Sequence, residues 1–147
     1  MPKGFASLAT MIVATIVLIA IGIAVTSVGF TELLSGATEN NARLAYRYAA
    51  TGANDALLRL AKNKKYFCDS GPGCPYQIAF VLNGCSIAYE GCALVLVGAG
   101  VGSSLDPKII TATGRVKSNV RVVQVTVVFD SALNGKIESA VWKEIVQ

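Results

Sequence analysis

The sequence predicts an α+β fold, in which one long N-terminal helix packs on an antiparallel sheet. Residues 4–31 are mostly apolar and carry no charged side chain. Between residues 32 and 65, apolar residues recur at steps of three and four, which is the period of an amphipathic helix. From Tyr76 onward, apolar and polar residues alternate instead, which is the period of a strand. A helix that is followed by strands, rather than alternating with them, indicates the α+β class.

The uncharged run predicts a membrane-spanning helix over residues 5–31. At about 1.5 Å per residue such a helix is roughly 40 Å long, whereas a bilayer core is about 30 Å thick. Lys3 directly precedes the run and is expected on the cytoplasmic side, which sends the chain after Glu32 outward. We therefore expect a single-pass inner (cytoplasmic) membrane protein, in contact with membrane lipid, with an exported C-terminal domain.

Two other interpretations of this run remain open. It fits an uncleaved signal anchor for an exported domain that binds a ligand or partner without polymerising. It also contains Ser27-Val28-Gly29, a small-x-small sequence at which a signal peptide is cleaved. The apolar region before that site is longer than the roughly 7 to 15 residues typical of signal peptides. Cleavage there would release a secreted soluble domain.

The junction Lys3-Gly4-Phe5 favours a more specific interpretation. A basic residue, a glycine and a phenylalanine that opens a long uncharged helix resembles the leader junction of type IV pilins and type II secretion pseudopilins. The resemblance covers about the first 30 residues and implies a leader of residues 1–4. It implies cleavage after Gly4 by a prepilin peptidase and N-methylation of Phe5, the mature N-terminus. It further implies a pilin-like fold and other pilin or pseudopilin subunits as partners.

Ala9 departs from the pattern of that family. The family carries a glutamate at the fifth mature position, where it is thought to pair with the terminal amine of a neighbouring subunit. A carboxylate within lipid is costly unless it is paired, and Ala9 offers no charge at all. With this departure, the resemblance implies a minor subunit of a type IV pilus-like filament or of a type II secretion pseudopilus. After assembly, such a subunit is extracellular or periplasmic.

Residues 32–65 predict that the helix continues beyond the membrane as an amphipathic helix, with a possible interior break at Ser35-Gly36. Its apolar stripe is rich in alanine and suited to close packing; it comprises Leu33, Ala37, Asn41, Leu44, Ala45, Tyr48, Gly52, Ala56, Leu57 and Leu60. Lys62, Lys64 and Lys65 follow, where cations complement the dipole of a helix C-terminus. This capping role explains the lysines more simply than phosphate contacts do, so a nucleic-acid partner is not expected.

Residues 66–147 are expected to form a disulfide-containing antiparallel β domain. Four cysteines in an exported domain indicate two disulfides. The turn at residues 71–73 would fold Cys68 onto Cys74, and Cys85 and Cys92 flank a short loop, so these local pairs are favoured over the other two connectivities. Zinc is the weaker alternative, because neither spacing is Cys-x-x-Cys and the chain has no histidine.

Four or five strands joined by short turns predict a mainly antiparallel sheet. The expected strands are Tyr76–Leu82, Leu94–Val97, Ile109–Val116, Val123–Phe129 and Ile137–Val146. The expected turns are Asn83-Gly84, Lys117-Ser118-Asn119 and Asn134-Gly135.

The sequence favours no catalytic function. The glycine-rich residues 98–102 lack the spacing and the βαβ context of a dinucleotide-binding turn and are expected to form a flexible loop. The acidic residues Asp106, Asp130, Glu138 and Glu144 are scattered, so they suggest no metal site, cofactor site or carboxylate pair. Histidine, the commonest general base, is absent from the chain. We therefore expect a structural subunit and not an enzyme.

Overall fold

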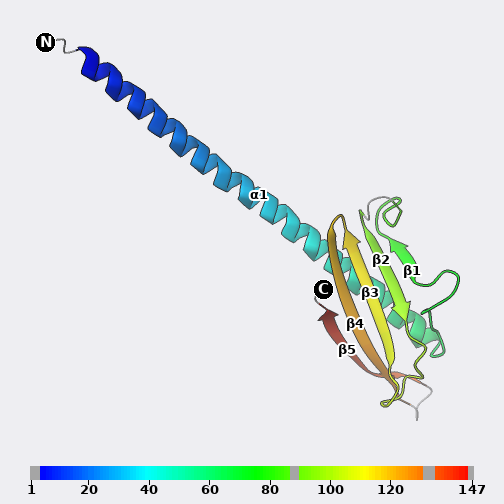
Figure 1. Ribbon diagram of the computed structural model, residues 1–147. Helices are drawn as coiled ribbons and strands as arrows, with labels where there is room; N and C mark the ends of the chain where they lie inside the picture. The colour runs from blue at the N-terminus through cyan, green and yellow to red at the C-terminus, as the bar shows by residue number, and fades with distance from the viewer. Residues whose placement is uncertain (1–3, 87–89, 131–134, 146–147) are drawn as a thin grey trace. The chain divides into compact units, whose positions relative to one another are not determined.

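The computed structural model describes residues 4–86, 90–130 and 135–145; within the helix it describes side chains from Thr10 onward, except at residue 28. The elements are α1 (Gly4–Lys62), β1 (Tyr76–Ala79), β2 (Cys92–Val97), β3 (Lys108–Val116), β4 (Asn119–Phe129) and β5 (Ile137–Ile145) (Figure 1). The predicted α+β class is confirmed. The chain divides into two compact units, Met1–Glu39 and Asn40–Gln147, and each is described by itself.

All described residues of the unit Met1–Glu39 belong to helix α1. Every side chain described in it, from Thr10 onward, is exposed. The helix continues through Ser35 and Gly36 without the interior break that the sequence allowed. A side chain at Gly36 would meet no atom within 4 Å, so this glycine is not required by any close packing.

The buried stripe of α1 begins later than the sequence predicted. Leu33 is 74% exposed and Ala37 is also exposed, whereas burial starts near Asn41. The fully buried apolar residues of α1 are Ala45, Ala49, Ala53, Ala56 and Leu60, of which Ala49 and Ala53 were not in the predicted stripe. The prediction failed at its first two positions because helical periodicity alone cannot separate an apolar residue that contacts protein from one that does not.

The five strands form one antiparallel sheet in the order β1-β2-β3-β4-β5, as a meander (Figure 1). Four boundaries differ from the prediction, and the predicted end of the last strand at Val146 lies outside the described residues. Strand β2 starts at Cys92 instead of Leu94, and β3 starts at Lys108 instead of Ile109. Strand β1 ends at Ala79, before Leu82, because the chain turns there, with the Gly84 amide donating to the Val81 carbonyl at 2.9 Å. Strand β4 starts at Asn119, since a tight turn at Lys117, with φ of 53°, pairs Asn119 directly with Val116.

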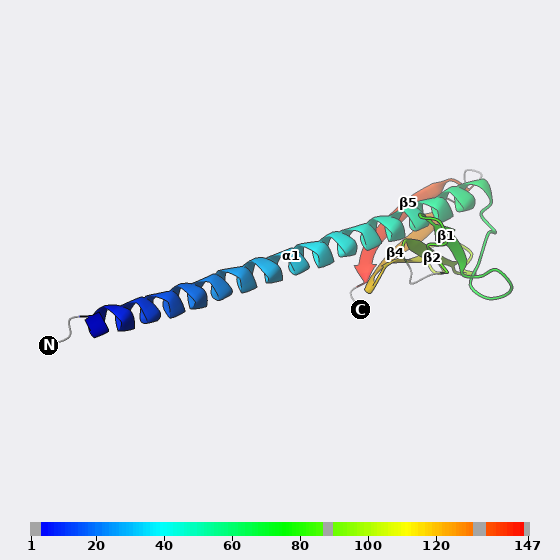
Figure 2. The ribbon, with the colours of Figure 1, turned by 90° about the horizontal axis from the view of Figure 1, so that it is seen from above.

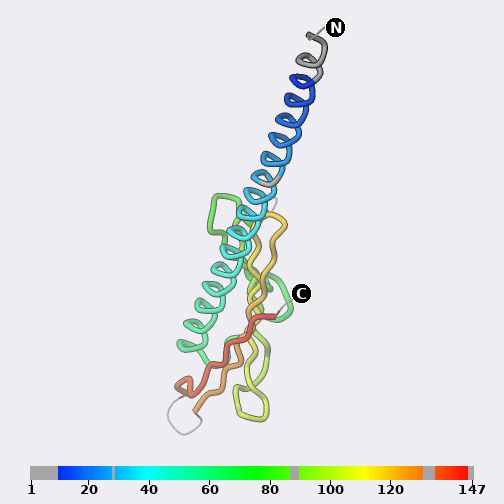
Figure 3. Tube along the Cα trace, turned by 90° about the vertical axis from the view of Figure 1, so that its left-hand side faces the viewer, coloured from blue at the N-terminus to red at the C-terminus, as the bar shows by residue number. Residues whose placement is uncertain are grey.

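The hydrophobic core lies between one face of the sheet and the last turns of α1. Alternate residues of β2, β3 and β4 are buried on this face: Val95, Val97, Ile110, Ala112, Val123, Val125 and Val127. Figures 2 and 3 show the C-terminal part of α1 running along that face. The other face is half-exposed and carries threonines, as expected for an antiparallel sheet with one solvated side.

The helix and the sheet approach each other most closely at Gly114 of β3. A Cβ atom there would overlap the carbonyl oxygen of Ala45 and press on the amide nitrogen of Ala49. On the helix side, a Cβ atom at Gly52 would lie 2.8 Å from Cγ2 of Val95. Small residues on both surfaces therefore allow contact at backbone distance.

This contact predicts that Gly114→Ala destabilises the domain by about 2 kcal/mol, because backbone atoms of α1 must move to admit the methyl group. Thr113→Ala, on the opposite face of the same strand, is the control and should change the free energy of unfolding by less than about 1 kcal/mol. Urea unfolding of the full chain in detergent measures both. Equal stability of the two variants would show that the helix does not pack this closely.

Candidate functional site

Two features carry the functional argument, and the first is the exposed part of α1. This helix is long and apolar enough to cross a membrane, judged by length and composition. Its large apolar side chains between Met11 and Leu34 are about half to three-quarters exposed. No side chain that the structure describes in the unit Met1–Glu39 is buried. The described part of the chain therefore does not cover this apolar surface.

The hydroxyl groups on this surface bond back to the helix. Thr15 donates to the carbonyl of Met11 at 3.0 Å, and Thr26 donates to the carbonyl of Gly22 at 2.9 Å. Ser27 makes the same kind of bond one turn back along the helix. In lipid a polar group without a partner is costly, and such bonds to the preceding turn satisfy it internally. This part of α1 is therefore suited to a lipid environment.

The structure gives no side-chain geometry for the residues of the predicted leader junction. Gly4 is the first residue of α1, and Phe5 and Ala9 belong to the same helix. Their side chains, and residues 1–3 entirely, lie outside the part of the chain that the structure describes. Processing at Gly4 and methylation at Phe5 remain predictions.

The second feature is the pair of cysteine loops. The structure pairs Cys68 with Cys74 and Cys85 with Cys92, as the sequence favoured, with Cα–Cα distances of 5.3 and 4.8 Å. Both loops are attached to strand β2. Cys92 is its first residue, and Cys68 exchanges two backbone hydrogen bonds with its last residue, Val97. Each end of β2 therefore anchors one loop.

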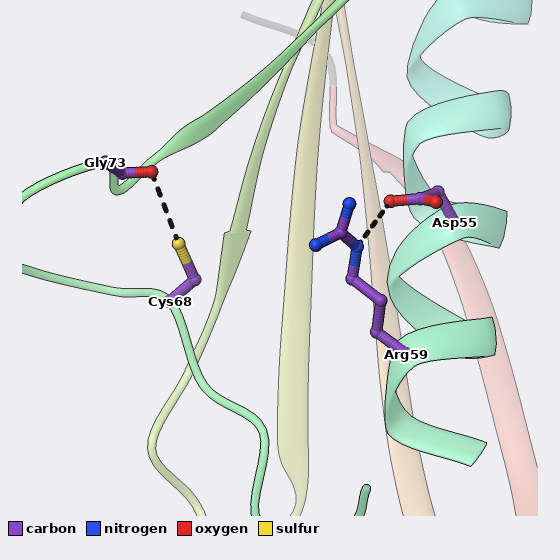
Figure 4. A network of polar contacts seen from close by, with 4 residues as sticks. All are labelled: Asp55, Arg59, Cys68 and Gly73. Carbon is purple, nitrogen blue, oxygen red and sulfur yellow. Dashed lines mark hydrogen bonds and ion pairs between the residues drawn. The ribbon is translucent and has the colours of Figure 1, made fainter. Parts of the chain in front are cut away.

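Arg59 of α1 holds the first loop against the helix. Its Nε donates to Oδ2 of Asp55 at 2.8 Å (Figure 4), and its guanidinium lies 4.3 Å from the ring centroid of Tyr76 and 5.8 Å from that of Tyr66. The hydrogen bond from Arg59 to Asp55 raises the pKa of the guanidinium. Such a cation over aromatic faces contributes on the order of 1 kcal/mol.

Within the same loop, Sγ of Cys68 lies 3.8 Å from the Gly73 carbonyl oxygen (Figure 4). A disulfide sulfur carries no proton to donate, so this is a packing contact and not a hydrogen bond.

Tyr76 beside Arg59 is half-buried. Its hydroxyl is buried and has no hydrogen-bond partner among the described residues. Burial, and secondarily the Asp55 carboxylate, raises the pKa of Tyr76. The phenol therefore stays protonated at neutral pH, and the cluster acts as a structural clamp.

Tyr48 of α1 contacts Phe80, whose amide donates to the carbonyl of Gly91 in the second cysteine loop at 2.9 Å. The rings of Tyr48 and Phe80 are stacked, with centroids 4.1 Å apart and planes 6° from parallel. Both cysteine loops are thus tied to β2 by backbone or disulfide bonds and to α1 by an aromatic contact. The sequence analysis placed Tyr48 in the helix stripe but missed Arg59, Tyr66 and Phe80 as partners, since only the fold brings them together.

The glycine-rich segment after β2 is held by backbone hydrogen bonds near both ends, and its flexibility stays a prediction. The Gly98 amide donates to the Ile109 carbonyl at 2.8 Å, and the Gly102 amide donates to the Asp106 carbonyl at 2.8 Å. Positive φ at Gly102, 82°, and the ring of Phe129 beside it exclude a side chain there. Among the residues described, no group of three or more acidic, cysteine or histidine side chains could hold a metal ion.

Comparisons of the chain with protein-family models, with curated proteins and with solved structures find no match. The proposed function therefore rests on the residues and contacts described above.

The cysteine geometry predicts the products of non-reducing digestion with chymotrypsin. Cleavage after Phe67 and Tyr76 should release the Cys68–Cys74 loop as one peptide, lighter than its reduced form by the two thiol hydrogens. Cleavage after Tyr89 should leave the Cys85 peptide joined to the Cys92 peptide. Mass spectrometry before and after reduction identifies both. A peptide that links Cys68 or Cys74 to Cys85 or Cys92, or four alkylated thiols, would contradict the pairing.

Proposed function

We propose that this chain is a minor pilin or pseudopilin, a subunit of a type IV pilus-like filament or of a type II secretion pseudopilus. The observation that carries the proposal is the difference in burial between the two parts of helix α1. Up to Glu39, every described side chain of α1 is exposed and most are apolar, whereas from Ala45 to Leu60 the same helix supplies the core of a sheet domain. The junction Lys3-Gly4-Phe5 at its start supports the same proposal.

The proposed mechanism is assembly. Before assembly the N-terminal helix lies in the inner membrane, and afterwards it packs with the helices of other subunits in the filament. Ala6, Thr10 and Ala14 follow one another at four-residue spacing, which lets helices approach closely in a bundle. The disulfide-bonded sheet domain is exported and faces outward, where an oxidising compartment preserves its two disulfides.

The proposal assigns the chain no catalytic role. The polar clusters of the sheet domain are explained by structural contacts, because Arg59 lies between Asp55 and two aromatic rings and Tyr76 is buried. The second candidate is an exported binding domain on a signal anchor that does not polymerise, and the same exposed helix supports it. Processing at the N-terminus separates the two candidates, because a signal anchor is not cut at Gly4.

The first functional prediction concerns maturation. The mature chain should begin with N-methylated Phe5, and Gly4→Val should leave Met1 in place because a branched side chain blocks the peptidase at the cleaved bond. Membrane insertion should be unchanged, since the apolar helix is intact. Intact-mass measurement and N-terminal sequencing of the membrane fraction detect both outcomes.

The matched control for maturation is Gly36→Ala, which alters a helical glycine with no neighbour within 4 Å and should be processed normally. A functional chain that retains Met1 in its mature form would refute the pilin assignment and favour the signal anchor.

The second functional prediction concerns copy number. Ala9 offers no carboxylate to the terminal amine of a neighbour, so the chain should polymerise poorly with itself and enter filaments only with partner subunits. Ala9→Glu should change incorporation into filaments while leaving the unfolding of the sheet domain unaltered, because residue 9 lies outside the unit Asn40–Gln147. Immunogold labelling counts the copies: dense, uniform decoration by the wild-type chain would identify a major subunit instead.

A further inference from the structure

A pocket lies between the segment that follows α1 and the loop that joins β2 to β3, within the unit Asn40–Gln147. Its volume is about 440 Å³, and it is lined by Lys64, Lys65, Phe67, Ala99, Gly100, Val101 and Lys108. Three of the seven lining residues are lysines and three carry apolar side chains. Nothing in the proposed assembly role uses this pocket, so it requires its own explanation.

Lys108, the first residue of β3, is the most unusual part of the lining. It is only 2% exposed, although lysine is almost never fully buried without a partner. Its Nζ donates to the Gly98 carbonyl at 3.3 Å, and this is the one hydrogen bond recorded for it among the described residues. An ammonium group has three donors, so this bond leaves donor capacity at the pocket wall. Burial lowers the pKa of Lys108, which marks the ammonium as poorly solvated.

The acidic groups near Lys108 do not neutralise the pocket fully. Asp106 and Asp69 partly oppose the effect of burial on the pKa of Lys108. Oδ2 of Asp106 already accepts a hydrogen bond from the Val101 amide at 2.9 Å, and Asp69 is exposed to solvent. The lining contains three lysines, which outnumber these two carboxylates, so an excess of positive charge remains.

The other two lysines differ in position. Lys64 packs its side chain beside Gly135, with its Nζ 5.6 Å from the ring centroid of Phe129, and so forms a fixed wall. Lys65 is exposed, so its flexible side chain is available to a ligand at the mouth. One buried cation, Lys108, and one exposed cation, Lys65, therefore line the same pocket, which suits an anion that enters from solvent.

The apolar part of the lining indicates that the ligand has an apolar body beside its anionic group. Phe67 is 56% exposed and Val101 is 72% exposed, which are large fractions for apolar side chains beside a pocket. We propose that the pocket binds a small organic anion, in which one carboxylate or phosphate group is attached to an apolar body. The anionic group contacts Lys108 and Lys65, and the apolar body covers Phe67 and Val101. This inference holds whether or not the chain polymerises.

The test uses the full-length, isotope-labelled chain in detergent micelles, followed by NMR during titration. The probes are benzoate and phenyl phosphate, compared with acetate and inorganic phosphate, all at one ionic strength set with chloride. We expect saturable shifts of the amide signals of residues 98–102 and of Lys108. The phenyl-bearing anions should bind about 10-fold more tightly than the small ones, because they bury apolar area. The ratio of benzoate to phenyl phosphate affinity identifies which anionic group the site prefers.

Two variants and one control assign the binding to these residues. Lys108→Met should weaken benzoate and phenyl phosphate binding by about 10-fold or more, since a charge-assisted hydrogen bond is lost. Lys143→Met removes an exposed lysine of β5 and should leave the affinity unchanged.

If Lys108→Met fails to fold, Lys65→Glu decides the matter, because its exposed position leaves folding unaffected while the reversed charge should weaken binding about 10-fold. Absence of saturable shifts with all four probes, or wild-type affinity in the folded variant, would overturn the proposal.

Discussion

The close contact between α1 and the sheet at Gly114 is the constraint on which the folded domain depends. Because no side chain separates β3 from Ala45 and Ala49, helix and sheet meet almost backbone to backbone. Larger side chains along the stripe would keep the two surfaces apart, so the alanines from Ala45 to Ala56 follow from the same contact. The core is consequently thin, and five valines of β2 and β4 share it with Leu60, Ile110 and Phe129.

A thin core explains why the two cysteine loops are cross-linked. Each loop closes on itself through a disulfide and is fixed to an end of β2, and α1 adds one aromatic contact to each, through Arg59 and Tyr48. Short loops of this size gain about 2 to 3 kcal/mol from a disulfide. Edge strand β1 has four residues and pairs only with β2, so it relies on the loops on either side of it.

The sequence predicts the features that repeat along the chain and misses those that the fold creates. The alternation of Val123, Val125 and Val127 identifies β4, and local spacing is sufficient to pair the cysteines. Helical periodicity wrongly placed Leu33 in the buried stripe. Periodicity alone does not indicate at which residue the contact of the helix with the sheet begins. The burial of Lys108 was unforeseeable, since a lysine that begins a strand is ordinarily exposed and its hydrogen bond to the Gly98 carbonyl exists only in the fold. Gly114 within a strand was an available signal of close backbone approach.

The charge pattern of α1 separates the part that packs on the sheet from the part whose described side chains are all exposed. Within residues 40–147 the buried apolar groups contact one another, and the arginines nearest the core have partners in Asp55, Glu144 and aromatic rings. From residue 4 to residue 31 there is no charge to repel lipid, and the described hydroxyls of Thr15 and Thr26 are bonded to the helix itself. An apolar surface of this kind is stable only against lipid or other apolar helices. The two environments that satisfy it are the membrane and a helical bundle, and the free-energy difference between them is small because lipid tails are as apolar as the side chains. In the proposed assembly, transfer from one to the other would depend on the packing of small residues and on charges supplied by neighbouring subunits.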